Sequence, residues 1–139
     1  MPIKIKMNKI VTSGKRKSAV ARAVVGEGSG KVTINKRPYQ HLEIMKRLMI
    51  EEPLRIAVEK LGSLKYDIEV SVRGGGQESQ IEAARLAIAR ALVEATKSSE
   101  LRKAYLLYDR NMLVADTRRK EAYKPGDSKA RAKRQKSYR

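Results

Sequence analysis

The stretch YDIEVSVRGGG (residues 66–76) carries the clearest secondary-structure signal in this chain of 139 residues. Every second residue from Tyr66 to Val72 is apolar, which is the pattern of a β-strand with one buried face. Three glycines end the strand, and SQIE (residues 79–82) is the sequence of a helix capping box. The helix predicted there carries an apolar stripe formed by Ile81, Ala84, Ile88, Leu92 and Ala95. A helix packed on a sheet, in an α+β (two-layer) protein, follows from this stretch.

Three shorter strands are predicted before it. Two runs of β-branched and small residues lie between Asn8 and Val25, with TSGKRK (residues 12–17) between them. The second run, 18–25, predicts a strand that ends at the glycine-rich residues 26–30. Residues 31–34 predict a further strand, with the glycine-rich stretch as a hairpin loop. Together these patterns predict an N-terminal antiparallel meander.

The apolar period becomes helical between Tyr39 and Gly62. Pro53 suits the first position of a helix, and Gly62 suits the residue that stops it. Glu51 and Glu52 would then lie near the first turn, where the helix dipole favours carboxylates.

The last part of the chain changes character at about residue 115. Residues 99–108 predict a short helix, with Leu101, Tyr105 and Tyr108 on one side, and residues 111–115 are apolar but too few to classify. After Ala115 no aliphatic residue is larger than alanine. Such a segment buries too little surface to offset the backbone entropy of ordering, about 1–2 kcal/mol per residue. We therefore expect a folded body (1–115) and a basic tail (116–139) that orders only against a partner.

The net charge of +17 is concentrated at the two ends of the sequence. Residues 1–26 carry +7, residues 27–117 carry +2 and residues 118–139 carry +8. Solubility requires a net charge of only roughly 2–8 in magnitude. Charge blocks of this kind indicate interaction arms for a polyanion, and Tyr123 and Tyr138 are tail aromatics suited to stacking on bases.

Signals for catalysis or cofactors are weak. The chain has no cysteine and one histidine, His41, which is best interpreted as a helix-surface or partly packed residue. No His/Cys cluster predicts a metal site. GEGSGKV (residues 26–32) lacks the first glycine and the Ser/Thr of a phosphate loop, and Gly74–Gly76 lacks the lysine and spacing of a nucleotide site. We expect no enzyme, no metal, no cofactor and no small-molecule substrate.

Membranes and specific DNA sites are also disfavoured. No run of about 18 uncharged apolar residues predicts a membrane span, and the first residues lack the apolar core of a secretory signal. The tail has no large apolar residue to insert into lipid. No helix-turn-helix or zinc-finger pattern is present. RNA in a large cytoplasmic particle is the partner that fits best.

Three motifs resemble those of the ribosomal protein S-nine family of the small subunit, in its archaeal form, which is similar to eukaryotic S-sixteen. They are GKRKSAVARA (residues 14–23), V-x-x-RGGG (70–76) with Gln80 and residues 83–85 following, and QKSYR (135–139). The resemblance covers essentially the whole chain. It implies a fold like the second domain of ribosomal protein S-five: a mixed sheet with helices on one face and a left-handed β-α-β crossover. It also implies a place in the head of the small subunit, beside other head proteins.

The same resemblance implies which residues bind RNA. Ribosomal RNA would be contacted by Lys15, Arg16, Lys17, Arg118, Arg119, Lys120, Lys129, Arg131, Lys133, Arg134 and Lys136. The P-site tRNA would be approached by Ser137, Tyr138 and Arg139. The bacterial pattern ends Gln-Phe-Ser-Lys-Arg, so Tyr138 stands where a cation is expected. A catalytic or RNA-processing domain and a nonspecific DNA-packaging protein are the alternative functions.

Overall fold

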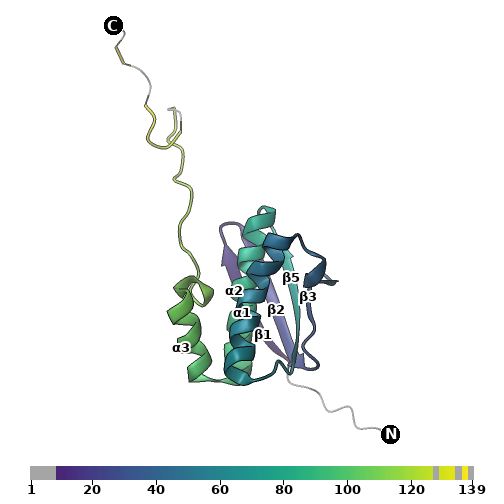
Figure 1. Ribbon diagram of the computed structural model, residues 1–139. Helices are drawn as coiled ribbons and strands as arrows, with labels where there is room; N and C mark the ends of the chain where they lie inside the picture. Colours follow the sequence, from purple (N-terminus) through teal and green to yellow (C-terminus); the bar gives the residue numbers. More distant parts are fainter. Residues whose placement is uncertain (1–8, 127–128, 134–135, 138–139) are drawn as a thin grey trace.

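Strand β5 (Tyr66–Arg73) is the central strand of a five-stranded sheet in the computed structural model, which describes residues 9–126, 129–133 and 136–137. The other strands are β1 (Ile10–Arg16), β2 (Ala19–Glu27), β3 (Val32–Ile34) and β4 (Arg37–Pro38). The sheet order is β1-β2-β5-β3-β4, as Figure 1 shows for the strands that it labels. All neighbours are antiparallel except β3 and β5, which are parallel. The sheet is therefore mixed, as the family resemblance implies.

The predicted N-terminal meander is wrong, because β3 pairs with β5 and not with β2. The residues between β2 and β3 form a crossing loop instead of a hairpin. The backbone N–H groups of Ser29, Gly30 and Lys31 all donate to Asp67 Oδ1, at 2.9, 3.0 and 2.9 Å. This carboxylate draws the loop across the end of β5, so the chain re-enters the sheet on the far side of β5.

Strand β1 is also longer than predicted. It continues through residues 12–16, which were expected to separate two runs, and only the short turn at Lys17 and Ser18 precedes β2. Lys17 has a φ of 52°, the left-handed conformation that a tight turn requires.

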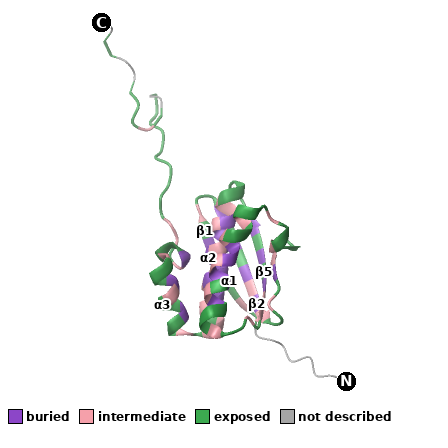
Figure 2. Ribbon diagram, viewed as in Figure 1, coloured by how far each residue is buried: buried purple, intermediate pink, exposed green. Residues whose placement is uncertain are grey.

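Three helices cover one face of the sheet (Figure 1). Helix α2 (Gln77–Thr96) packs directly on β1, β2 and β5, helix α1 (Ile44–Leu61) packs against α2, and α3 (Ser99–Tyr108) packs against α1. Two short 3₁₀ turns, η1 (Tyr39–His41) and η2 (Arg110–Met112), precede α1 and follow α3. The connection from β3 through α1 to β5 forms a β-α-β crossover. Figure 2 shows the buried residues lying between the helices and the sheet.

Small residues allow α2 to lie close to the sheet. Ala83, Ala84, Ala87 and Ala91 are fully buried, and the predicted stripe of Ile81, Ala84, Ile88 and Leu92 faces the core. Opposite them, a Cβ on Gly14 of β1 would lie 2.3 Å from the Ala83 carbonyl oxygen. Thr12 donates its hydroxyl to the Ala87 carbonyl at 3.0 Å.

Two predicted helix starts are wrong. Pro53 lies in the middle of α1, which begins at Ile44, so Glu51 and Glu52 are not first-turn residues. Glu51 instead pairs with Arg47 and Arg55, one turn before and one turn after it, at 2.8 Å each, and these pairs support the helix around the proline. Gly62 ends α1 with a φ of 80°, as predicted.

Helix α2 begins at Gln77, so the SQIE segment is no capping box. Gly74 and Gly75 have φ values of 76° and 64°, which end β5 abruptly and bring Gly76 to the N-cap position. The Gly76 carbonyl then accepts the N–H of Gln80 at 3.0 Å. Ser79 consequently lies inside the helix.

The predicted helix 99–108 is confirmed as α3, with Leu101 and Tyr105 fully buried and Tyr108 exposed. Tyr105 donates its hydroxyl to the Pro53 carbonyl of α1 at 2.7 Å. The short apolar segment that follows contributes η2, whose Met112 is fully buried. Beyond η2 the described residues form no helix or strand, and this segment leads away from the body (Figure 1). No helix in the described part of the chain is long and apolar enough to cross a membrane.

Candidate nucleic-acid interface

Two guanidinium groups hold the junction between the body and the tail, residues 113–116, which we call the tail root, against α2 and β1. Arg90 of α2 donates Nε to the Leu113 carbonyl and Nη1 to the Ser13 carbonyl of β1, each at 2.9 Å. Arg16, at the end of β1, places Nη1 3.0 Å from the Asp116 carboxylate. The direction in which the tail leaves the body is therefore set by contacts to both the sheet and α2.

Asp116 joins the body to the tail electrostatically. Besides Arg16, it pairs with the guanidinium of Arg118 at 2.7 Å and accepts the Arg118 backbone N–H at 3.0 Å. The side chain and backbone of Arg118, with Arg16, hold the pKa of the Asp116 carboxyl well below its usual range. Asp116 is thus ionised near neutral pH and is paired with a cation on each side.

A second ionic cluster stiffens the same corner of the body. Arg85 of α2 contacts Glu52 of α1 and lies 3.2 Å from Asp109, which caps η2 by accepting the Asn111 N–H at 2.9 Å. The tail root therefore follows a segment that is tied to both neighbouring helices.

The three cations predicted near the first turn differ in their surroundings. Lys15 and Lys17 are exposed, and the described residues offer neither side chain a hydrogen-bond or ionic partner. Arg16 is only 15% exposed and contacts Glu82 as well as Asp116. A phosphate that binds Arg16 would have to compete with two carboxylates. A phosphate that binds Lys15 or Lys17 would meet no such competition from the described residues.

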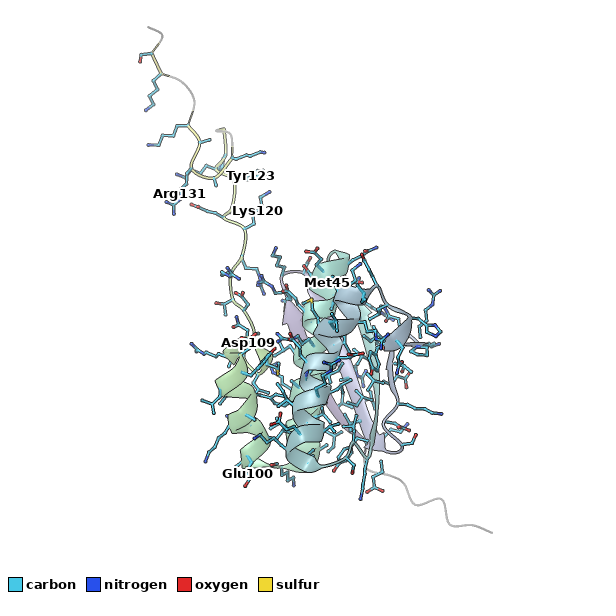
Figure 3. The ribbon with its side chains drawn as sticks, in the orientation of Figure 1. Met45, Glu100, Asp109, Lys120, Tyr123 and Arg131 are labelled. Carbon is cyan, nitrogen blue, oxygen red and sulfur yellow. The ribbon has the colours of Figure 1, made fainter. Side chains whose placement is uncertain are left out.

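The predicted tail residues that the structure describes are exposed: Arg118, Arg119, Lys120, Lys129, Arg131, Lys133, Lys136 and Ser137. Arg131 forms a 3.1 Å pair with Glu121, and both side chains are more than half exposed. Lys120 lies 2.7 Å from the Tyr123 hydroxyl and 4.6 Å from the centre of its ring. Figure 3 shows these side chains projecting from the tail well away from the body. Arg134, Tyr138 and Arg139 lie outside the described residues.

The sequence interpretation missed the role of Asp116 and Glu82. Arg16 lies 66 residues from Glu82 and 100 from Asp116 in the sequence, so no local pattern connects them. The only signal was that Asp116 is an acid at the start of a basic tail.

Groups that could support other chemistry are dispersed. His41 is exposed in η1, and the described part of the chain contains no group of three or more His, Asp or Glu side chains suited to holding a metal ion.

Comparison with known proteins places these features in a family. The model of the family "Ribosomal protein S9/S16" matches residues 14–139, which include the last three residues of β1, strands β2 to β5, all three helices and the tail. The chain belongs to this family. Three curated relatives, each named "Small ribosomal subunit protein uS9", match over 138 residues that cover 96% of this chain and all of the relative. The protein of Methanococcus vannielii is 49% identical, and those of two strains of Methanococcus maripaludis are 47% identical.

Membership of the S9/S16 family agrees with the fold expected from the sequence motifs. The five-stranded mixed sheet, the helices on one face and the crossover through α1 are all present. The family match ends at Arg139 and therefore includes the basic tail.

Proposed function

We propose that this chain is a structural constituent of the small ribosomal subunit, where it binds ribosomal RNA and reaches the P-site tRNA with its last residues. The proposal rests on 49% identity, over essentially the whole chain, to a protein named as a small ribosomal subunit protein. Such a role needs no catalytic group and no cofactor. It places the chain in the cytoplasm, on the ribosome, beside other proteins of the subunit head.

The RNA contacts are proposed to come from both the body (1–115) and the tail (116–139). In the body, Lys15 and Lys17 have no competing partner among the described residues, whereas Arg16 would exchange a carboxylate for a phosphate. In the tail, the exposed Arg131–Glu121 pair belongs to a class worth only about 0–1 kcal/mol, so RNA phosphates displace it at little cost. The proposed tail contacts are Arg118, Arg119, Lys120, Lys129, Arg131, Lys133, Arg134 and Lys136.

The tRNA contact is proposed for Ser137, Tyr138 and Arg139. Tyr138 replaces the cation of the bacterial pattern, so Arg139 becomes the main charge available for the tRNA backbone. The tyrosine ring offers stacking or a hydrogen bond in place of the missing charge.

A first experiment tests the assembly role. The tagged chain, expressed in an archaeal host, should sediment with small subunits in a sucrose gradient. Recovery only in fractions that lack RNA would reject the proposal.

A second experiment tests the phosphate contacts of the tail. No described residue from 118 onward is buried, so deletion of 118–139 should leave the body folded. The association constant K for ribosomal RNA is measured at several salt concentrations. The slope of log K against the logarithm of the salt concentration should become shallower by about 0.7–0.9 per lost phosphate contact. A matched variant, with the tail lysines and arginines changed to glutamine at full length, should behave in the same way. An unchanged slope in both would show that the tail makes few phosphate contacts.

A third experiment separates tRNA binding from assembly. Removal of Arg139 alone should weaken P-site tRNA binding to purified subunits while incorporation of the chain stays normal. Loss of incorporation would contradict this division of roles.

A further inference from the structure

The sheet face opposite the helices is open. The covered face carries the core residues of β1, β2 and β5, and the alternate residues of the same strands point away from it. Val11 is 47% exposed and Val20 is 46% exposed, although both lie within strands. Nothing in the described part of the chain covers this face.

Strand register places three cations together on the open face. Lys15 of β1 and Arg73 of β5 both lie opposite Val20 of β2, in one row across the sheet. In the next row, Arg22 of β2 lies between Ser13 and Ser71. Arg22 is therefore a diagonal neighbour of Lys15 and of Arg73, at about 7–8 Å, and those two are about 10 Å apart across two strand spacings.

These cations form no ion pair within the part of the chain that the structure describes. Lys15, Arg22 and Arg73 are exposed, and among the described residues none of the three side chains has a hydrogen bond or ion pair. The arginines near the covered face differ, since Arg16 and Arg85 contact carboxylates and Arg90 contacts two carbonyls. Among the described residues, the three cations of the open face are regularly spaced and unpaired, and the same face also carries the exposed Glu69 of β5, opposite Val24.

The nearby turns extend the same charged edge. A Cβ on Gly74 would lie 2.6 Å from the Ser18 carbonyl oxygen, so the turn after β5 packs against the turn between β1 and β2. That second turn carries the exposed Lys17. A fourth cation therefore lies at the end of the sheet where Lys15 and Arg73 are found.

We propose that this basic sheet face, formed by Ser13, Lys15, Arg22, Ser71 and Arg73, binds an RNA duplex independently of the tail. The inference rests on the proposed function, which supplies RNA as the partner. Open sheets that read single-stranded RNA stack bases on aromatic side chains. The outward positions of these three strands hold no aromatic residue, since Tyr66 shares the core-facing side of β5 with Ile68 and Val70, so the face is suited to backbone contact. The two serine hydroxyls beside Arg22 suit the 2′-hydroxyl groups that line the minor groove of duplex RNA.

The test uses the full chain and a blunt RNA duplex of about 16 base pairs, the span typical of proteins that read duplex shape. Binding is followed by fluorescence anisotropy at several salt concentrations. The face variant is Lys15→Gln/Arg22→Gln/Arg73→Gln. The matched control, Lys60→Gln/Lys65→Gln/Arg102→Gln, removes three exposed charges from α1, the loop before β5, and α3.

The face variant should reduce the salt slope by about 2–3, since each phosphate contact contributes about 0.9. Its affinity at 0.1 M salt should fall by at least about tenfold, since each lost contact weakens binding several-fold at that salt. The control should change both quantities far less. Melting temperatures establish that both variants fold, and Arg22→Gln alone, expected to lower the slope by about 1, keeps the test open if the triple variant does not fold.

A second comparison tests the hydroxyl contacts. Ser13→Ala/Ser71→Ala should weaken binding to the RNA duplex but leave binding to a DNA duplex of the same sequence unchanged. Equal effects on RNA and DNA would overturn the 2′-hydroxyl part of the inference.

The tail variant Arg118→Gln/Arg119→Gln/Lys120→Gln separates this inference from the proposed function. If the face variant behaves like its control while the tail variant loses affinity, the sheet face does not bind RNA and the ribosomal role stands. That result is also the one expected if another protein covers the face. If the wild-type chain binds RNA no better than DNA and does not sediment with subunits, the proposed function itself fails.

Discussion

Gly14→Ala is the substitution whose cost follows most directly from the structure. The new Cβ would lie 2.3 Å from the Ala83 carbonyl oxygen and 2.7 Å from the Ala87 backbone nitrogen. Ordinary contacts of this kind exceed about 3.4 Å, and backbone atoms inside a 20-residue helix cannot move as a flexible side chain does. Helix α2 would have to move away from β1 by about 1 Å, which would loosen the alanine packing that holds it on the sheet.

Overpacking of this kind typically costs about 1–3 kcal/mol, and the backbone contact places Gly14→Ala at the upper end. For a folded part of about 100 residues, a loss of about 3 kcal/mol lowers the melting temperature by roughly 12–15 °C. The matched control is Gly26→Ala in β2, where a Cβ would meet nothing within 4 Å. Thermal and urea denaturation of the two variants should therefore differ sharply. If the melting temperature of Gly14→Ala equals those of the wild type and of Gly26→Ala, then α2 does not approach β1 as closely as described.

Further predictions concern single polar contacts. Tyr105→Phe removes a buried hydrogen bond and should cost about 1 kcal/mol in urea denaturation; an unchanged midpoint would show that the bond contributes nothing. Burial raises the pKa of Tyr105 above the ordinary tyrosine value of about 10. The wild type should therefore lose stability as the pH rises above about 10, and Tyr105→Phe should not show this loss. The backbone N–H groups of Lys31 and its two predecessors lower the pKa of Asp67. The stability that the ionised Asp67 carboxylate contributes is present above a pH of about 4 and is lost as the pH falls below it. The melting temperature of Asp67→Asn should therefore depend less on pH between about 3 and 5 than that of the wild type. Asp116→Ala should speed amide hydrogen exchange at Arg118 without changing global stability, and unchanged exchange would contradict the contact at the tail root.

Elements with a strong local pattern were predictable from the sequence. Strand β5 and helix α3 have the predicted bounds, because alternation in one and helical spacing in the other continue for the whole element. Pro53 misled the prediction of α1, because a proline is compatible with a first turn and, at higher cost, with a helix interior. Only tertiary packing, including the Tyr105 hydroxyl on the Pro53 carbonyl, decides between the two.

Pairing between distant segments was not predictable. The three residues of β3 carry no information about their neighbour in the sheet, and the Asp67 carboxylate that directs them to β5 lies more than 30 residues away. The same holds for the interface. Lys15 and Lys17 stand out as a charge run, whereas Arg22 and Arg73 join them only through the register of β2 with its two partners.

The central position of β5 has a consequence for synthesis of the chain. When β1 to β4 have been made, the pairings of the sheet allow them only two separate hairpins, because β2 and β3 meet only through β5. About 40 residues separate the end of β3 from the end of β5, which at about 5–20 residues per second leaves both hairpins with an unsatisfied edge for about 2–8 s. The nascent sheet is most vulnerable to misassociation in that interval. The basic tail is synthesised only after β5, the strand that joins the two hairpins.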